Sequence, residues 1–127
     1  MQEQHLFEYA VIRIVPRVER EEFLNVGVIL FCKRPVYLGV RYNLDEKKIK
    51  HLFGETDIDC LRASLNSLQK IAAGDQDGGP IARLDAAGRF RWLTATRSTM
   101  LQTSKVHPGL CTDPTKMLDN LFGKLVL

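Results

Sequence analysis

The segment VGVILFC, residues 26–32, limits the folds open to this chain more than any other part of the sequence. Neighbouring side chains of a β-strand point to opposite faces, so this apolar run is apolar on both faces and belongs at the centre of a sheet. It is far shorter than the roughly 18 residues that a membrane-spanning helix needs. A chain of 127 residues, 45% hydrophobic and 26% charged, can bury one such core. We therefore predict a single domain over residues 1–127.

Hydrophobic periodicity predicts the other elements. Strands are expected in EYAVIRIV (8–15), VYLGVRY (36–42), RFRWLT (89–94) and, more weakly, STMLQTS (98–104). The breaker KRP before residue 36 indicates a hairpin with the central strand. Helices are expected in LDEKKIKHLFG (44–54), TDIDCLRASLNSLQKIAAG (56–74) and TDPTKMLDNLFGKLVL (112–127).

The order of these elements predicts an α+β fold. A mainly antiparallel sheet of about five strands would carry two to three helices packed on one face, while the other face stays partly open. In RFRWLT, Arg89 and Arg91 alternate with Phe90 and Trp92, which is typical of a strand with one buried face. The two arginines would then point to the open face of the sheet.

The cysteines and the N-terminus bound the chemistry and the compartment. Cys32, Cys60 and Cys111 are odd in number and lack the short spacings of zinc or redox motifs, so we expect buried free thiols. Neither a metal nor a cofactor is predicted. The start, MQEQHLFEYA, has no basic region followed by an apolar stretch, which favours a cytoplasmic protein without a membrane segment.

The net charge of +3 is modest, but two stretches concentrate the positive residues. Residues 33–50 contain six Lys or Arg against two acidic residues, and residues 83–105 contain five against one. A local basic surface attracts phosphate, nucleic acid or an acidic partner. The alternative is that these cations are scattered and solvated, which is the commoner case.

Two polar stretches hold the candidate binding residues. The first, IRIVPRVEREEFLNVG (12–27), surrounds the connection between two buried strands with charged residues. It contributes Arg13, Arg17, Glu22 and Asn25 as candidates. The alternative is structural: an ion-pair network fixes the connection, and Gly27 allows close backbone packing.

The second polar stretch is RFRWLTATRSTMLQTSKVHPG, residues 89–109. Guanidinium groups bind phosphate or carboxylate, hydroxyl and amide groups fix its orientation, and an imidazole can transfer protons near neutral pH. The candidate residues in this stretch are Arg91, Arg97, Ser98, Gln102, Ser104 and His107. The alternative is a solvated hairpin with ordinary turn residues. If both polar stretches meet in space, they form one site.

Two segments, YAVIRIVPRVEREEFLNVGVILF and RFRWLTATRSTMLQTSKVHPGL, together with the terminal LDNLFGKLV, resemble a bacterial family known as domain of unknown function 3037. The resemblance implies that the charged junction after Pro16 belongs to the family pattern, but it brings no reaction to transfer. It also implies that such a protein is often encoded beside a kinase similar to the Hip-type serine/threonine kinases of toxin-antitoxin modules.

Three functions are compatible with these features. The first is an accessory or regulatory protein that binds a protein partner, such as a Hip-like kinase. It would bind an acidic or phosphorylated surface of that partner through an arginine-rich sheet face. The alternative is an enzyme that processes phosphodiesters or nucleotides with Arg91, Arg97, Gln102 and His107. A third is RNA binding by the same stretch, residues 91–107. Because the standard catalytic motifs are absent, the sequence leaves open whether the protein is an enzyme.

Overall fold

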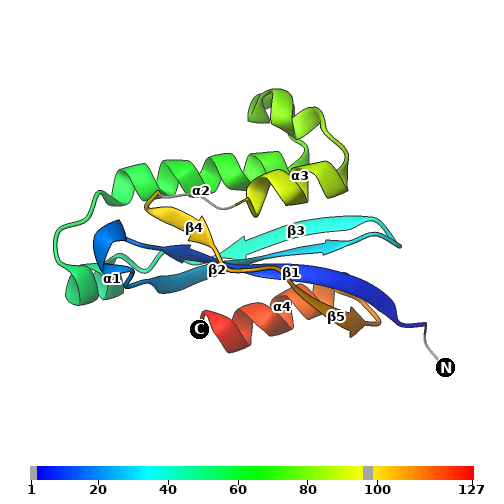
Figure 1. Cartoon of the computed structure of the whole chain (residues 1–127), viewed down its shortest axis with the longest axis horizontal. Coiled ribbons are helices and arrows are strands. Elements are labelled where there is room, and N and C mark those ends of the chain that lie inside the picture. The colour runs from blue at the N-terminus through cyan, green and yellow to red at the C-terminus, as the bar shows by residue number, and fades with distance from the viewer. Residues whose placement is uncertain (1–2, 96–98) are drawn as a thin grey trace.

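The computed structural model describes residues 3–95 and 99–127 and contains one antiparallel sheet (Figure 1). Its strands are β1 (His5–Ile14), β2 (Leu24–Cys32), β3 (Tyr37–Tyr42), β4 (Leu101–Thr103) and β5 (His107–Cys111). The order is β3-β2-β1-β4, and β5 also pairs with β1. The apolar run therefore lies inside the sheet, and the predicted hairpin with β3 is confirmed.

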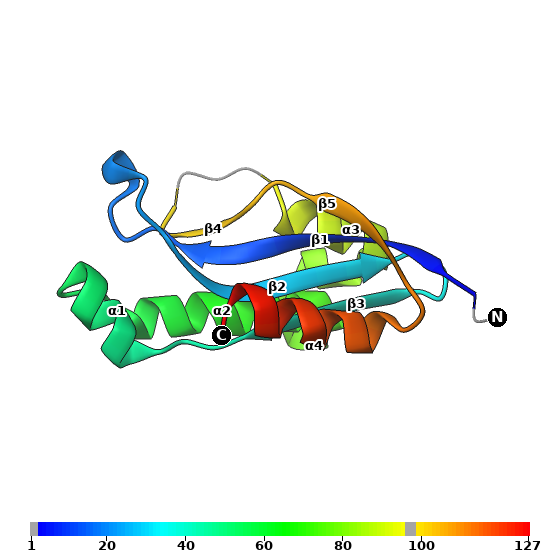
Figure 2. The same ribbon diagram turned by 90° about the horizontal axis from the view of Figure 1, so that it is seen from below.

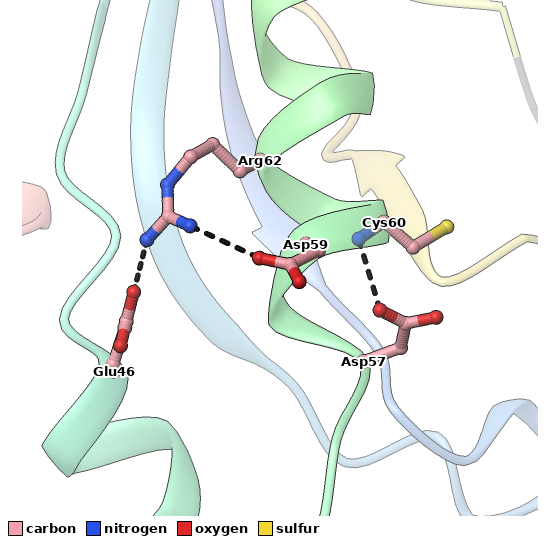
Figure 3. Close-up of polar contacts among 5 residues, drawn as sticks. All are labelled: Glu46, Asp57, Asp59, Cys60 and Arg62. Carbon is pink, nitrogen blue, oxygen red and sulfur yellow. Dashed lines mark hydrogen bonds and ion pairs between the residues drawn. The ribbon is translucent and has the colours of Figure 1, made fainter.

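The helices begin at acidic caps. They are α1 (Glu46–Phe53), α2 (Ile58–Ala73), α3 (Ala86–Leu93) and α4 (Pro114–Leu125), and short 3-10 turns lie at Val18–Arg20, Gln76–Gly78 and Pro80–Arg83. A preceding aspartate accepts a backbone N–H at the start of each α-helix, as Asp57 does from Cys60 at 3.0 Å (Figure 3). Three of the four helices fall where the sequence predicts them.

Helices cover both faces of the sheet (Figures 1 and 2). Helices α2 and α3 pack on one face against Ile12, Ile14 and Ile29, while Leu118 of α4 packs on the other against Val28 and Leu30. The α+β class and the antiparallel sheet of five strands are confirmed. Four helices exceed the predicted number, and α4 occupies the face expected to stay partly open. A central strand that is apolar on both sides requires cover on both sides.

The predicted strand at residues 89–94 is wrong, because this segment belongs to α3. Phe90 and Leu93 are buried and lie three residues apart, which is helical spacing. The Phe90 ring stacks on Phe31 with centroids 5.4 Å apart, so it is a core residue and not a base-stacking platform. Arg89 donates from Nη1 to the Leu84 carbonyl at 2.6 Å. Neither Arg89 nor Arg91 therefore points from an open sheet face.

The cysteines agree with the prediction in part. All three are free, and Cys32 and Cys111 are buried, but Cys60 is exposed. Cys60 belongs to the first turn of α2, whose buried stripe begins at its neighbour Leu61. Figure 3 shows Cys60 beside the exposed ion pairs of Arg62 with Glu46 and with Asp59, which link the starts of α1 and α2.

Candidate functional site

The two polar stretches meet near the end of β1, where it pairs with the start of β2 and with β4. Arg13 of β1 lies opposite Asn25 of β2 on one side and opposite Gln102 of β4 on the other. The strand register shifts between Ile12 and Arg13, and Gly27 lies at this irregularity. A Cβ atom at Gly27 would be 2.7 Å from the Arg41 carbonyl oxygen of β3, so the predicted close backbone packing at Gly27 is confirmed.

We call Arg13, Asn25 and Gln102 the row, and their side chains make contacts within the protein. Asn25 donates from Nδ2 to the Leu125 carbonyl at the end of α4, at 3.2 Å. Gln102 donates from Nε2 to the Thr99 carbonyl at 2.8 Å. The Arg13 guanidinium lies 3.9 Å from the centre of the Phe23 ring, a cation–π contact. These contacts hold α4 and the β1–β2 connection in place, which agrees with the structural alternative for the first stretch.

Two atoms of the row keep unused hydrogen-bonding capacity. Arg13 Nε and Asn25 Oδ1 are buried and have no hydrogen-bond partner among the described residues. Burial lowers the pKa of the Arg13 guanidinium from its ordinary value, because removal from water disfavours the charged form. A donor and an acceptor on paired residues are a place where an ordered water can bridge. The three side chains are a guanidinium and two amides, and none is a carboxylate, imidazole, amine, phenol or thiol, so the row supplies no general base.

The remaining candidates of the two stretches lie elsewhere. Ser104 accepts from the Val11 amide at 2.8 Å and donates to the Lys105 carbonyl. Glu22 pairs with Arg20, the only ion pair that the described residues form within the charged connection, so the expected network there is a single pair. Arg17, Arg20 and Glu22 line one hollow of about 150 Å³ together with Leu52 and Phe53 of α1, so the structure brings the candidates Arg17 and Glu22 together. Arg97 and Ser98 lie outside the described residues.

His107 and Arg91 lie on opposite faces of the sheet. His107 of β5 pairs with Tyr9 of β1, and their ring centroids are 5.4 Å apart on the α4 side. Tyr9 precedes Arg13 by four residues, which is about 13 Å along a strand. Arg91 belongs to α3 on the other side. The described residues of the enzymatic alternative therefore do not form one site.

A surface groove lies between α3 and the end of the sheet where β1 begins and β2 ends. These elements are at the right of Figure 1. The groove has a volume of about 410 Å³. Its lining comprises Leu6, Glu8, Phe31, Lys33, Arg34, Ala87 and Arg91. We call it the basic groove, because three cations face one carboxylate around an apolar wall.

The fold brings these cations together from both basic stretches. Lys33 and Arg34 follow directly after the last residue of β2, and Arg91 lies one helical turn after Ala87 on the same side of α3. Among the described residues, none of these three cations forms an ion pair. The sequence analysis identified Arg91 as a candidate but did not identify the other lining residues. A helix over residues 86–93 places Arg91 beside Ala87, because residues four apart lie on the same side of a helix. The sequence analysis interpreted residues 89–94 as a strand and therefore missed this pairing.

Within the described part of the chain, no group of His, Cys, Asp and Glu could hold a metal ion. No helix there has the length and apolar character to cross a bilayer. The described fold is thus a small α+β domain whose sheet is covered on both faces and whose surface carries a basic groove.

The family model for DUF3037, described as a protein of unknown function, matches residues 9–126. The match spans nearly the whole chain, so the protein belongs to this family, and the resemblance in the sequence is confirmed. No curated protein and no solved structure matches the chain.

Proposed function

We propose that this protein is a bacterial cytoplasmic accessory or regulatory protein that binds an acidic segment of a protein partner in the basic groove. The partner class implied by the sequence resemblance, a kinase similar to the Hip-type serine/threonine kinases, is part of this proposal. The site differs from the arginine-rich sheet face of the sequence analysis, because helices cover both faces of the sheet.

The single observation that supports the proposal is the set of unpaired cations around one groove. Lys33, Arg34 and Arg91 are exposed and lack ion-pair partners among the described residues. Cations gathered around one hollow raise the local positive potential, and an anionic ligand lowers the electrostatic free energy. Glu8 offsets only part of this charge. The groove therefore favours an acidic ligand over a neutral one.

Affinity purification from the native cells tests this function. The tagged protein and its variant Lys33→Gln/Arg34→Gln/Arg91→Gln are purified in parallel, each with and without nuclease treatment. Mass spectrometry identifies the proteins that accompany each, and nucleic acid is extracted and measured. We expect a stoichiometric protein with the wild type that is lost from the triple variant and at high salt, since salt screens exposed charges. A kinase-like protein would identify the partner class.

The matched control is Lys47→Gln/Lys70→Gln/Lys116→Gln, which removes the same charge from exposed positions on α1, α2 and α4. This control should retain the partner. A partner that the groove variant retains as well as the wild type does would contradict the proposed site. Recovery of RNA alone, lost on nuclease treatment, would contradict a protein partner and favour the RNA-binding alternative.

A further inference from the structure

We infer that the basic groove recognises a phosphorylated serine or threonine side chain of its protein partner, so that binding depends on phosphorylation. The inference rests on the proposed function and specifies the chemical group that the groove takes. It combines the charge of the groove, the chemistry of its donors and the nature of its walls.

The charges of the groove complement those of a phosphate. Lys33, Arg34 and Arg91 against Glu8 leave a formal excess of two positive charges, from three cations and one carboxylate. A phosphorylated side chain carries about −1.5 to −2 at neutral pH, whereas an acidic side chain carries a single charge. Two of the three cations are arginines, whose planar groups bind phosphate oxygens in pairs. The groove therefore matches a phosphate better than one carboxylate.

The walls of the groove favour a peptide as the carrier of that phosphate. Leu6 is 62% exposed and lies in the groove with Ala87, so apolar surface is available to a side chain that flanks the phosphate. Proteins that bind single-stranded nucleic acid commonly stack its bases on exposed aromatic rings. The one aromatic lining residue, Phe31, is 8% exposed and stacks on Phe90. Glu8 also repels a continuous row of phosphates.

NMR titration of the ¹⁵N-labelled protein tests the inference. The probes are three pools of short peptides with mixed apolar residues around a central phosphoserine, serine or glutamate, and a fourth probe is oligouridylate. The phosphoserine pool should shift the amides of Lys33, Arg34 and Ala87 at concentrations at least about tenfold lower than the glutamate pool, because a phosphate carries more negative charge and more acceptor oxygens than a carboxylate. The serine pool should produce no shifts.

Two further measurements make the assignment specific. Arg91→Gln should weaken phosphoserine binding at least about tenfold, whereas Lys116→Gln on α4 should leave it unchanged. Binding of the phosphoserine pool should weaken as the pH falls from about 7.5 to about 5.5, across the second phosphate pKa of about 6, while glutamate binding stays constant.

The possible failures are distinct. Equal binding of the glutamate and phosphoserine pools would overturn phosphate recognition and leave an acidic-segment site in place. Tighter binding of oligouridylate in the groove would overturn both the inference and the protein partner. Shifts in none of the groove residues with any acidic probe would overturn the inference and the proposed site together.

Discussion

At the scale of single residues, the candidates divide between structure and binding according to their partners. Asn25 donates to a backbone carbonyl of α4, Gln102 donates to the Thr99 carbonyl just before its own strand, and Arg13 lies over an aromatic ring. Polar side chains in a largely apolar sheet must find such partners, because an unpaired buried group costs free energy. Lys33 and Arg91 have no protein partner among the described residues and remain available to a ligand.

The contact between Asn25 and α4 gives a prediction about stability. Asn25→Ala removes the donor to the Leu125 carbonyl at the end of the helix, so we expect it to lower the free energy of unfolding by about 1 kcal/mol. Urea denaturation followed by circular dichroism measures the change. Asn120→Ala, at an exposed position of the same helix, should change stability by less than about 0.5 kcal/mol. Equal effects of both substitutions would refute the anchoring role.

At the scale of elements, local hydrophobic periodicity predicts most helices and strands. It fails where the same residues fit both the period of a strand and the period of a helix. Residues 89–92 alternate between charged and apolar, which indicates a strand, yet Phe90 and Leu93 also satisfy helical spacing. Asp85 supplies the deciding signal, because its carboxylate accepts from the Gly88 amide and starts α3. The helix then places Arg91 in the basic groove and not on an open sheet face.

The second layer of the fold depends on α4, and this gives a prediction at the same scale. Leu118 is 4% exposed and packs on Val28 and Leu30, so Leu118→Ala should destabilise the protein by about 3 kcal/mol through lost burial and an unfilled cavity. Leu110→Ala, at a residue that is 58% exposed, should cost less than about 0.5 kcal/mol. Chemical denaturation of both variants separates the two. A small effect at Leu118 would mean that α4 does not cover this face.

At the scale of the whole molecule, burial is shared by two apolar clusters on either side of one sheet. Strand β2 contributes Ile29 to one cluster and Leu30 to the other, because its neighbouring side chains point to opposite faces. Loss of either layer exposes apolar residues of the same central strands. We therefore expect the two layers to unfold together in one cooperative transition.

Thiol reactivity tests this cooperativity. Cys60 is exposed and should react with an aromatic disulfide reagent in the folded protein, whereas Cys32 and Cys111 are buried and should react only on unfolding. Burial raises the pKa of the Cys111 thiol, with smaller contributions from Cys32 and Asp113. At a given pH this thiol is therefore less often the reactive thiolate.

The two slow thiols should appear with the same urea dependence, and Cys60→Ser should abolish only the fast phase. Reaction of Cys111 well before Cys32 would show that the α4 side opens separately.

Local sequence patterns are enough to predict those elements of this protein that depend on the chemistry of a few neighbouring residues. The doubly apolar run of β2, the aspartate caps and the apolar stripes of α2 and α4 each act within a few residues, so they predict the elements and the α+β class. Of the site, the sequence identified Arg91 and the two basic stretches as candidates.

Only the tertiary structure decided which residues meet. It placed Arg13 between Asn25 and Gln102, set His107 apart from Arg91, and brought Lys33 and Arg34 next to α3. These contacts follow from the order of the strands in the sheet and from the face on which each helix packs. Both depend on how the whole chain buries the strands that are apolar on both faces. A local sequence pattern does not specify which distant segments pack against it, so the groove forms only when the helices pack on the sheet.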